Sequence, residues 1–135
     1  MTYWLIKAEP EDCSIDSLAA DGKTLWTGVR NYAARNNLRA MQLGDTCIFY
    51  RSMVKPAIVG LANVTATAVQ DPTCPDEPAW LAVEISFAHK FSHELPLKML
   101  KTTVGLEAMT LFRISRLSVQ PVTDTEFEII RSMGA

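Results

Sequence analysis

Residues 26–37, with the sequence WTGVRNYAARNN, bring together side chains that bind flat and anionic groups. The segment contains two aromatic rings, two guanidinium groups and three amides, and it has no acidic residue. An aromatic ring stacks on a flat ligand, a guanidinium group binds phosphate or carboxylate oxygens, and an amide donates and accepts hydrogen bonds. A ligand that engages all three carries a planar heterocycle beside an anionic group, as a nucleotide does.

Positive charge is concentrated around this segment. The chain has a formal net charge of -2, yet residues 23–55 contain six basic side chains against Asp45 alone, a local net charge of +5. Residues 1–22 sum to -4 and residues 56–135 to -3. A positive surface on an acidic body favours an anionic partner such as nucleic acid. Charge alone fits a solvated face with scattered arginines equally well.

Composition and length limit the class of protein. The 135 residues fit a single domain, predicted over residues 1–135, and the 48% hydrophobic and 21% charged content is typical of globular proteins. No apolar run reaches the length that crosses a bilayer, and the start MTYWLIKAEPED lacks the features of a signal peptide. We therefore predict a cytoplasmic protein, taken by default as a monomer. Three scattered cysteines and two histidines predict no disulfide framework, no metal site and no cofactor.

The elements that must position the polar segment follow from periodicity, β-propensity and helix caps. We predict strands over residues 2–8, 46–52, 57–69, 80–89 and 111–122. Helices are predicted after the N-cap Ser14, from the N-cap Asn31 to residue 41, from Pro96, and after a capping box of Thr123 and Glu126. The order β-α-α-β-β-β-α-β-α predicts an α+β fold: a closed or nearly closed mixed β-barrel with short helices packed around it.

Four segments resemble the EVE domain family: YWLIKAEP, WTGVRNYAARNNLRAMQLGD, YRS with IVGLANV, and RLSVQPV. The resemblance runs over essentially the whole chain. This family is part of the PUA-like superfamily, beside the ASCH and the methyladenine-reading YTH domains. The resemblance implies a PUA-like mixed β pseudo-barrel that binds nucleic acid through a pocket for one modified base. Ala33 and Arg51 stand where the family usually has glutamine and often has histidine, and these departures concern the ligand rather than the fold.

A base that leaves its stack is gripped on its faces by aromatic rings and on its edge by hydrogen bonds. We predict Trp26 as one aromatic wall and Trp80 as a second. Residue type alone favours Trp26 as a core tryptophan and leaves Trp80 evenly balanced between wall and core. The resemblance reverses the order for Trp26, because the matching position of YTH domains is a cage tryptophan.

The predicted edge contacts come from strand ends and from one helix N-terminus. Because side chains alternate along a strand, Arg116, Ser118 and Gln120 are predicted on one face, with Leu117 and Val119 in the core. Further predicted edge contacts are Lys7, Glu9, Asn31 and Ser52, and predicted phosphate contacts are Arg30, Arg35, Arg39 and Arg51. Asn31 fits a helix cap equally well, and Lys7 with Glu9 fits a surface salt bridge.

The sequence thus predicts a non-enzymatic module that reads a modified base in DNA or RNA, with methylated or hydroxymethylated cytosine and methyladenine as candidate marks. One alternative is a small-molecule, nucleotide-binding or protein-interaction module on the same scaffold. Another is a hydrolase acting on nucleotides or nucleosides, with Glu9, Asp12 and Asp16 as acid and base. We rank the hydrolase last, because no Ser-His-Asp pattern and no metal-ligand set occurs in the sequence.

Overall fold

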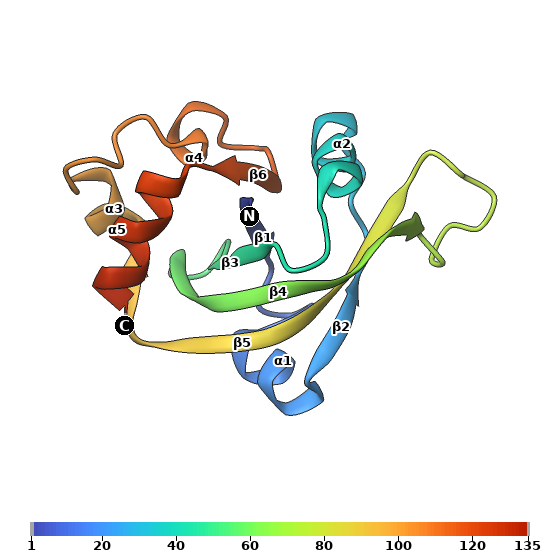
Figure 1. Ribbon diagram of the computed structural model, residues 1–135, viewed down its shortest axis with the longest axis horizontal. Coiled ribbons are helices and arrows are strands. Elements are labelled where there is room, and N and C mark those ends of the chain that lie inside the picture. The colour runs from blue at the N-terminus through green and yellow to red at the C-terminus, as the bar shows by residue number, and fades with distance from the viewer. Residues whose placement is uncertain (1, 135) are drawn as a thin grey trace.

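The structure is a computed structural model that describes residues 2–134, and within this range the chain forms one six-stranded sheet and five helices (Figure 1). In chain order the elements are β1 (Tyr3–Ala8), α1 (Ile15–Asp21), β2 (Lys23–Trp26), α2 (Tyr32–Ala40), β3 (Thr46–Arg51), β4 (Ala57–Gln70), β5 (Leu81–Pro96), α3 (Leu97–Lys101), α4 (Thr110–Arg113), β6 (Val119–Val122) and α5 (Asp124–Gly134). None of these helices is long and apolar enough to cross a membrane.

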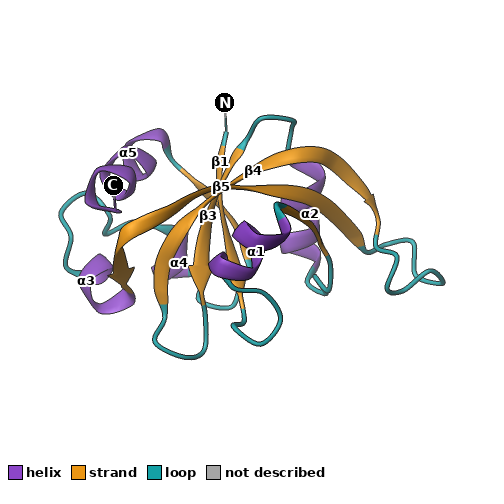
Figure 2. Cartoon of the chain, turned by 90° about the horizontal axis from the view of Figure 1, so that it is seen from below, coloured by secondary structure: helices purple, strands orange, loops and turns teal. Residues whose placement is uncertain are grey.

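The sheet has the strand order β2-β5-β4-β3-β1-β6, so β2 and β6 are its two edges. The β1–β3 pair is parallel, and the other pairs between residues 2 and 134 are antiparallel. Register shifts interrupt the long β4–β5 pair at four points, and such bulges bend and twist strands. The strands spread as a fan in Figure 2. The sheet curls toward a barrel, but within the described residues its edge strands do not pair with each other.

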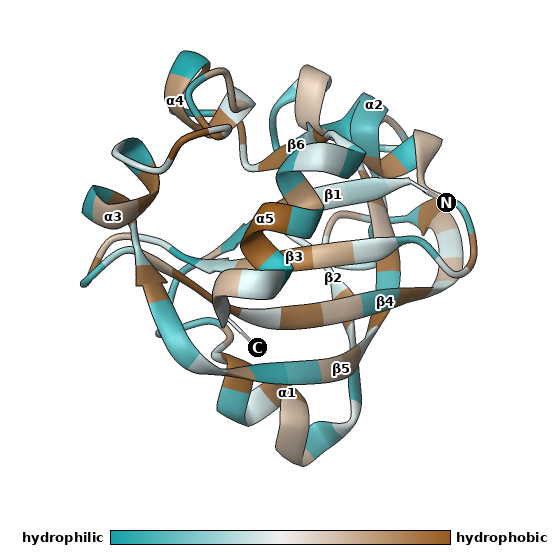
Figure 3. Cartoon of the chain, turned by 60° about the vertical axis from the view of Figure 1, so that its left-hand side comes forward, coloured by the Kyte–Doolittle hydropathy of each residue, from teal (hydrophilic) through white to brown (hydrophobic). Residues whose placement is uncertain are grey.

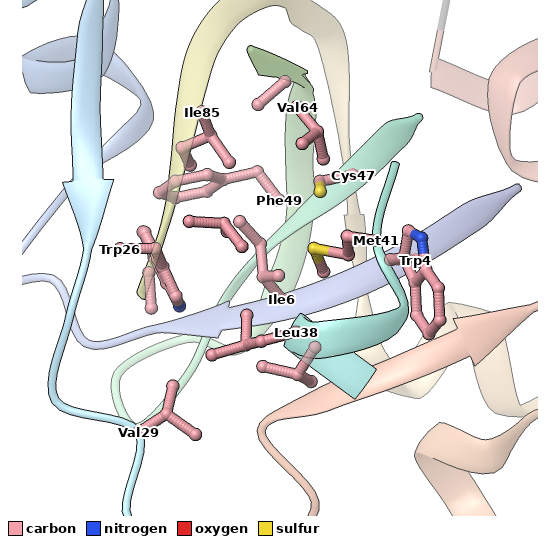
Figure 4. Packing of buried hydrophobic residues seen from close by; sticks show 14 of the residues in the cluster. Trp4, Ile6, Trp26, Val29, Leu38, Met41, Cys47, Phe49, Val64 and Ile85 are labelled. Carbon is pink, nitrogen blue, oxygen red and sulfur yellow. The ribbon is translucent and has the colours of Figure 1, made fainter. Parts of the chain in front are cut away.

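Both faces of the sheet are covered, which gives two hydrophobic clusters. The first contains Trp4 and Ile6 of β1 together with Trp26 and Phe49, and Figure 4 shows part of it. The second contains Leu5, from the opposite face of β1, and side chains of α5. Figure 3 shows α5 lying across β1, β3 and β4, and Figure 1 shows α3, α4 and α5 gathered on one side of the molecule. Burial on both faces explains why several strands read as continuous apolar runs.

The structure confirms the predicted helix caps. The Ser14 hydroxyl accepts from the Ser17 amide at 3.0 Å, and the Asn31 side chain accepts from the Ala34 amide at 3.0 Å. Thr123 and Glu126 form the predicted capping box, with distances of 3.0 and 3.2 Å between side chain and backbone. These contacts are local, three residues apart, and so they can be predicted from short sequence patterns.

One strand was not predicted, and two predicted strands have the wrong bounds. The strand β2 was not predicted, because its four residues form a half-exposed edge with too little apolar pattern. The predicted extended run over 111–122 is wrong at its start: Thr110–Arg113 form α4, whose Leu111 packs into the second cluster, and only Val119–Val122 form a strand. The strand predicted to end at residue 89 continues as β5 to Pro96. Bulges in its second half disrupt the alternation that marks a strand.

Candidate functional site

A cleft of about 360 Å³ lies in the seam where the sheet fails to close. We call it the seam cleft. One side is the end of β1 with the turn that follows, and the other is β2 with the loop that leads into α2. Its lining residues are Lys7, Ala8, Glu9, Asp12, Cys13, Thr24, Leu25, Trp26, Thr27, Gly28, Val29, Arg30 and Ser118. Because β2 pairs with β5 alone among the described strands, the backbone groups along its other edge face the seam.

Trp26 is both a core residue and a wall of the seam cleft. Its side chain belongs to the first cluster and meets the Phe49 ring edge-on, with ring centres 5.8 Å apart and an interplanar angle of 78°. The residue is 9% exposed and lines the cleft. Its indole N–H has no acceptor among residues 2–134 and is not sealed from solvent. Figure 4 shows this nitrogen on the side of the ring away from Phe49. The other core indole, Trp4, donates its N–H to Asp45 at 3.0 Å.

A buried carboxylate holds the loop that forms one wall of the cleft. Asp71, with a fully buried side chain, accepts from the Gly28 amide at 2.9 Å and from Nη1 of Arg30 at 3.0 Å. It also accepts from the amide and hydroxyl of Thr73, at 2.8 and 2.6 Å. Gly28 adopts φ +82°, a region that favours glycine, and its amide reaches Asp71 from that conformation. Asp71 thereby fixes the backbone next to Trp26 from 43 residues away along the chain.

These hydrogen bonds also set the charge of Asp71. Burial alone would raise the pKa of this carboxyl, but hydrogen bonds from Thr73, Gly28 and Arg30 outweigh burial and hold the pKa well below its usual range. Asp45 behaves in the same way. Burial opposes ionisation there, and donors from Gln42, Trp4 and Thr2 lower its pKa.

We expect stability to fall in acid because of these two carboxylates. A carboxyl whose pKa is lower in the folded state stabilises the fold above its unfolded pKa of about 4, and this contribution is lost as the pH falls below that value. Urea denaturation measured from pH 7 to pH 3 should show a declining midpoint below about pH 4. The Asp71→Asn variant should show a smaller decline, whereas Asp76→Asn, on an exposed residue of the same loop, should match the wild type. An equal decline in all three proteins would contradict the assignment.

Of the predicted late-strand contacts, the structure brings only Ser118 to the seam cleft. Its carbonyl accepts from the Lys7 amide at 2.9 Å, which extends the pairing of β1 with β6. Gln120 is fully buried on the opposite face of the sheet, level with Leu5, and its amide donates to the Leu117 carbonyl at 2.7 Å. Arg116 is exposed and does not line the cleft. The prediction that all three share one open face is therefore wrong, because only Val119–Val122 form a strand and the second cluster packs on the face that Gln120 shares with Leu5.

Lys7 lies near the end of β1 and Glu9 directly follows it, and both line the seam cleft. The Lys7 ammonium donates to the Ser115 carbonyl and lies 6.0 Å from the centre of the Tyr50 ring, and burial lowers its pKa. Glu9 is exposed at the mouth of the cleft, with Asp12 nearby in the lining. Among the described residues, no group of three His, Cys, Asp or Glu is placed to hold a metal ion.

Trp80 stands outside the seam cleft, in a stack of side chains that ties α2 to the β4–β5 loop. Its ring lies against the Tyr32 ring with centres 4.9 Å apart, and the Arg30 guanidinium lies 5.7 Å from its centre. Arg35 lies 5.2 Å from the centre of the Tyr32 ring and donates to the Ala79 carbonyl at 2.9 Å. The predicted second wall is therefore not beside the first. Stacking on Tyr32 and Arg30 occupies Trp80.

The remaining predicted contacts lie apart from the seam cleft. Asn31 caps α2, as its alternative reading predicted. Ser52 donates its hydroxyl to the Ala8 carbonyl at 3.0 Å, and so it supports the cleft wall from behind. Arg51 forms a two-pronged ion pair with Glu94. Arg39 is exposed on α2. Of the four arginines predicted to contact phosphate, Arg30 alone lines the cleft.

Sequence reasoning missed β2 and Asp71, and in the loop after β2 it named Arg30 but not Gly28. The motif Asp71-Pro72-Thr73 is typical of a turn in which the aspartate side chain bonds the backbone two residues on, and the structure has this bond at 2.8 Å. That pattern predicts the turn but not the contact with Gly28. Asn37 was also missed: its amide donates to the Val119 carbonyl at 2.6 Å and docks α2 against β6.

The curled sheet, open at a seam with a tryptophan wall, is the pseudo-barrel of a PUA-like domain, and the predicted fold class is confirmed. Residues 2–133 match the EVE domain, and the chain belongs to the EVE domain family. Thymocyte nuclear protein 1 of Mus musculus is 41% identical over 164 residues, and the match covers 97% of this chain and 73% of that protein.

Solved structures agree with this assignment. Protein Atu2648 from Agrobacterium tumefaciens superposes with a TM-score of 0.97 at 40% identity, over 100% of this chain and 94% of that one. The human THYN1 protein, solved in complex with DNA that contains 5-methylcytosine, superposes with a TM-score of 0.93 at 35% identity, over 99% and 98% of the two chains.

Proposed function

We propose that this protein binds nucleic acid and reads a modified base held in the seam cleft beside Trp26. The observation that carries the proposal is the Trp26 indole, which lines an open cleft with an N–H that no described residue accepts. A related protein, human THYN1, has been solved with DNA containing 5-methylcytosine. A volume of about 360 Å³ is at the low end of the range for ligand sites, which suits one base rather than a peptide or a duplex.

The chemistry of the cleft suits a base that enters edge first. The backbone edge of β2 and the Trp26 N–H offer hydrogen-bond donors and acceptors at fixed positions. The carboxylates of Glu9 and Asp12 accept from an exocyclic amino group, such as N4 of cytosine. A methyl group adds no hydrogen bond, and apolar contact with the indole recognises it. Arg30, at the rim, attracts the adjoining phosphate.

Binding rather than catalysis is the activity that we propose for this site. A hydrolase needs a carboxylate with a tuned pKa beside a nucleophile or a positioned water. The two carboxylates of the lining are exposed at its mouth. Both histidines lie on β5, outside the lining. Incubation of the protein with modified oligonucleotides, followed by assays for released free base and phosphate, tests for catalysis. Turnover that disappears in Glu9→Gln would overturn the proposal of binding alone.

Binding to a panel of oligonucleotides tests the proposed function. Fluorescence anisotropy at low salt would compare DNA and RNA strands that differ at one position: cytosine, 5-methylcytosine, 5-hydroxymethylcytosine, adenine or N6-methyladenine. We expect tighter binding to one modified base than to its unmodified parent, with 5-methylcytosine in DNA as the first candidate. Free nucleosides in the same panel test the small-molecule alternative. Equal affinity for all strands, or no binding, would refute base reading.

A further inference from the structure

A second hollow, larger than the seam cleft, opens at the ends of β3 and β5. Its volume is about 570 Å³, and we call it the lysine hollow. Apolar side chains line its floor, and basic side chains stand around it. The lining residues are Arg51, Lys55, Pro56, Ala57, Glu94, Pro96, Leu97, Lys98 and Lys101.

The charge of the lysine hollow is positive and largely unpaired. The Arg51 guanidinium and the Glu94 carboxylate neutralise each other through two hydrogen bonds of 2.8 Å. The three lysines Lys55, Lys98 and Lys101 are exposed, and none of them has an ion-pair partner among residues 2–134. Three ammonium groups stand around one hollow whose single carboxylate, Glu94, is hydrogen-bonded to Arg51, and this excess of positive charge favours a ligand with several negative charges.

Hydrogen bonds from Arg51 hold part of the rim of the lysine hollow. Arg51 donates from Nε and Nη2 to the Lys55 carbonyl, at 3.1 and 2.9 Å. Lys55 adopts φ +48° in the turn between β3 and β4. The same guanidinium that pairs with Glu94 therefore fixes the turn that carries Lys55. Arg51 is committed to this clamp, so the free cations of the hollow are its lysines.

The lysine hollow and the seam cleft are neighbours on one surface. A row of cross-strand neighbours joins the two sites. It runs from Ala8 of β1, in the seam cleft, through Arg51 of β3 and Ala57 of β4 to Pro96 of β5, in the lysine hollow. Adjacent strands lie about 4.8 Å apart, so this row spans roughly 14 Å. A smaller hollow of about 80 Å³ lies between, and it shares Cys13 with the seam cleft and Arg51 and Glu94 with the lysine hollow.

We propose that the lysine hollow binds the sugar–phosphate backbone of the strand whose modified base occupies the seam cleft. This inference rests on the proposed function. Phosphates along one strand of a duplex advance by about 3.4 Å each along the helix axis and lie farther apart along the strand itself, so a path of roughly 14 Å spans at most about four phosphates from the read base. Lysines contact phosphates as point charges, and the apolar floor contacts the sugars. The contact is independent of sequence: the cleft selects the base, and the hollow holds the strand.

Salt dependence tests the proposal. Single-stranded DNA with one central 5-methylcytosine would be titrated against the wild type and a Lys55→Gln, Lys98→Gln, Lys101→Gln triple variant at several salt concentrations. Each lost phosphate contact lowers the slope of log affinity against log salt by about 0.7, so we expect a slope shallower by roughly 2. The preference for 5-methylcytosine over cytosine should stay unchanged. A triple Lys→Arg variant keeps the charge and should keep the wild-type slope.

A second triple variant controls for overall charge, because it removes three exposed cations that line none of the three hollows. Its substitutions are Lys23→Gln, Arg113→Gln and Arg131→Gln. We expect its salt slope to stay closer to that of the wild type. Equal losses in the two glutamine variants would mean that net charge alone acts, and the proposal would be overturned.

Strand length gives an independent readout. The wild type should gain affinity from one to about nine nucleotides, and the glutamine variant of the lysine hollow should lose most of that gain. If the variant keeps the wild-type slope and length dependence while 5-methylcytosine is still preferred, the lysine hollow serves another ligand, and this inference fails while the proposed function stands. If the wild type binds no strand of any length, both fail together.

Discussion

Asp71→Ala is expected to lower the free energy of unfolding by about 2–4 kcal/mol. The substitution removes a fully buried carboxylate that accepts hydrogen bonds from Gly28, Arg30 and Thr73. Hydrogen bonds to a charged group contribute about 1.5–3 kcal/mol each, and disrupting a fully buried ion pair costs about 3–5 kcal/mol. We expect a loss somewhat smaller than that of a fully buried ion pair, because the Arg30 side chain is partly exposed and stays in contact with water. Chemical denaturation of the purified variant measures it.

The same substitution should weaken ligand binding, since it frees the loop that carries Gly28 beside Trp26. Asp76→Ala is the matched control, because Asp76 is exposed in the same loop. We expect this variant to keep the wild-type affinity. We expect Asp76→Ala to change stability by less than about 0.5 kcal/mol. A stable Asp71→Ala variant with wild-type affinity would show that the loop needs no anchor.

Trp26→Ala is expected to abolish the preference for a modified base. Stacking of a base on an aromatic ring contributes about 1–3 kcal/mol, so affinity should fall by about 5- to 150-fold. The variant also loses packing against Phe49, and removing a buried tryptophan costs about 3–5 kcal/mol of stability. Affinity must therefore be measured on protein shown to be folded by circular dichroism.

Trp26→Phe separates the two effects, because phenylalanine keeps an aromatic face and lacks the indole N–H. We expect it to fold, to bind more weakly than the wild type and to lose discrimination that depends on the N–H. Trp4→Phe is the control, since Trp4 is a buried indole of the same cluster that does not line the seam cleft. Undiminished base preference in both Trp26 variants would remove the indole from the site.

Local features of the fold could be predicted from sequence, and contacts between distant segments could not. The caps at Ser14 and Asn31 depend on atoms three residues away, so short patterns contain them. The pairing of β1 with β3 and the bond from Gly28 to Asp71 join residues about 43 apart, and no periodicity encodes them. β2 has four residues and owes its existence to β5.

The error at Gln120 has a physical cause. Alternation along β6 is real: Val119 belongs to the first cluster, and Gln120 lies on the other face. Alternation shows which residues share a face, and it does not show whether that face meets water. Here the second cluster, which contains the cross-strand neighbour Leu5, packs on that face, so a polar side chain is buried and its Oε1 has no hydrogen-bond partner among the described residues. Trp80 is a similar case, because its contact with Tyr32 joins the β4–β5 loop to α2 and depends on the folded structure.

The division of the interior by the sheet separates two kinds of substitution. Trp26 belongs to the first cluster, whereas Phe127 and Ile130 of α5 belong to the second. Substitution of these two side chains is expected to change the melting temperature with little effect on recognition. The sheet thus places the packing that sets stability beneath α5 apart from the wall of the seam cleft.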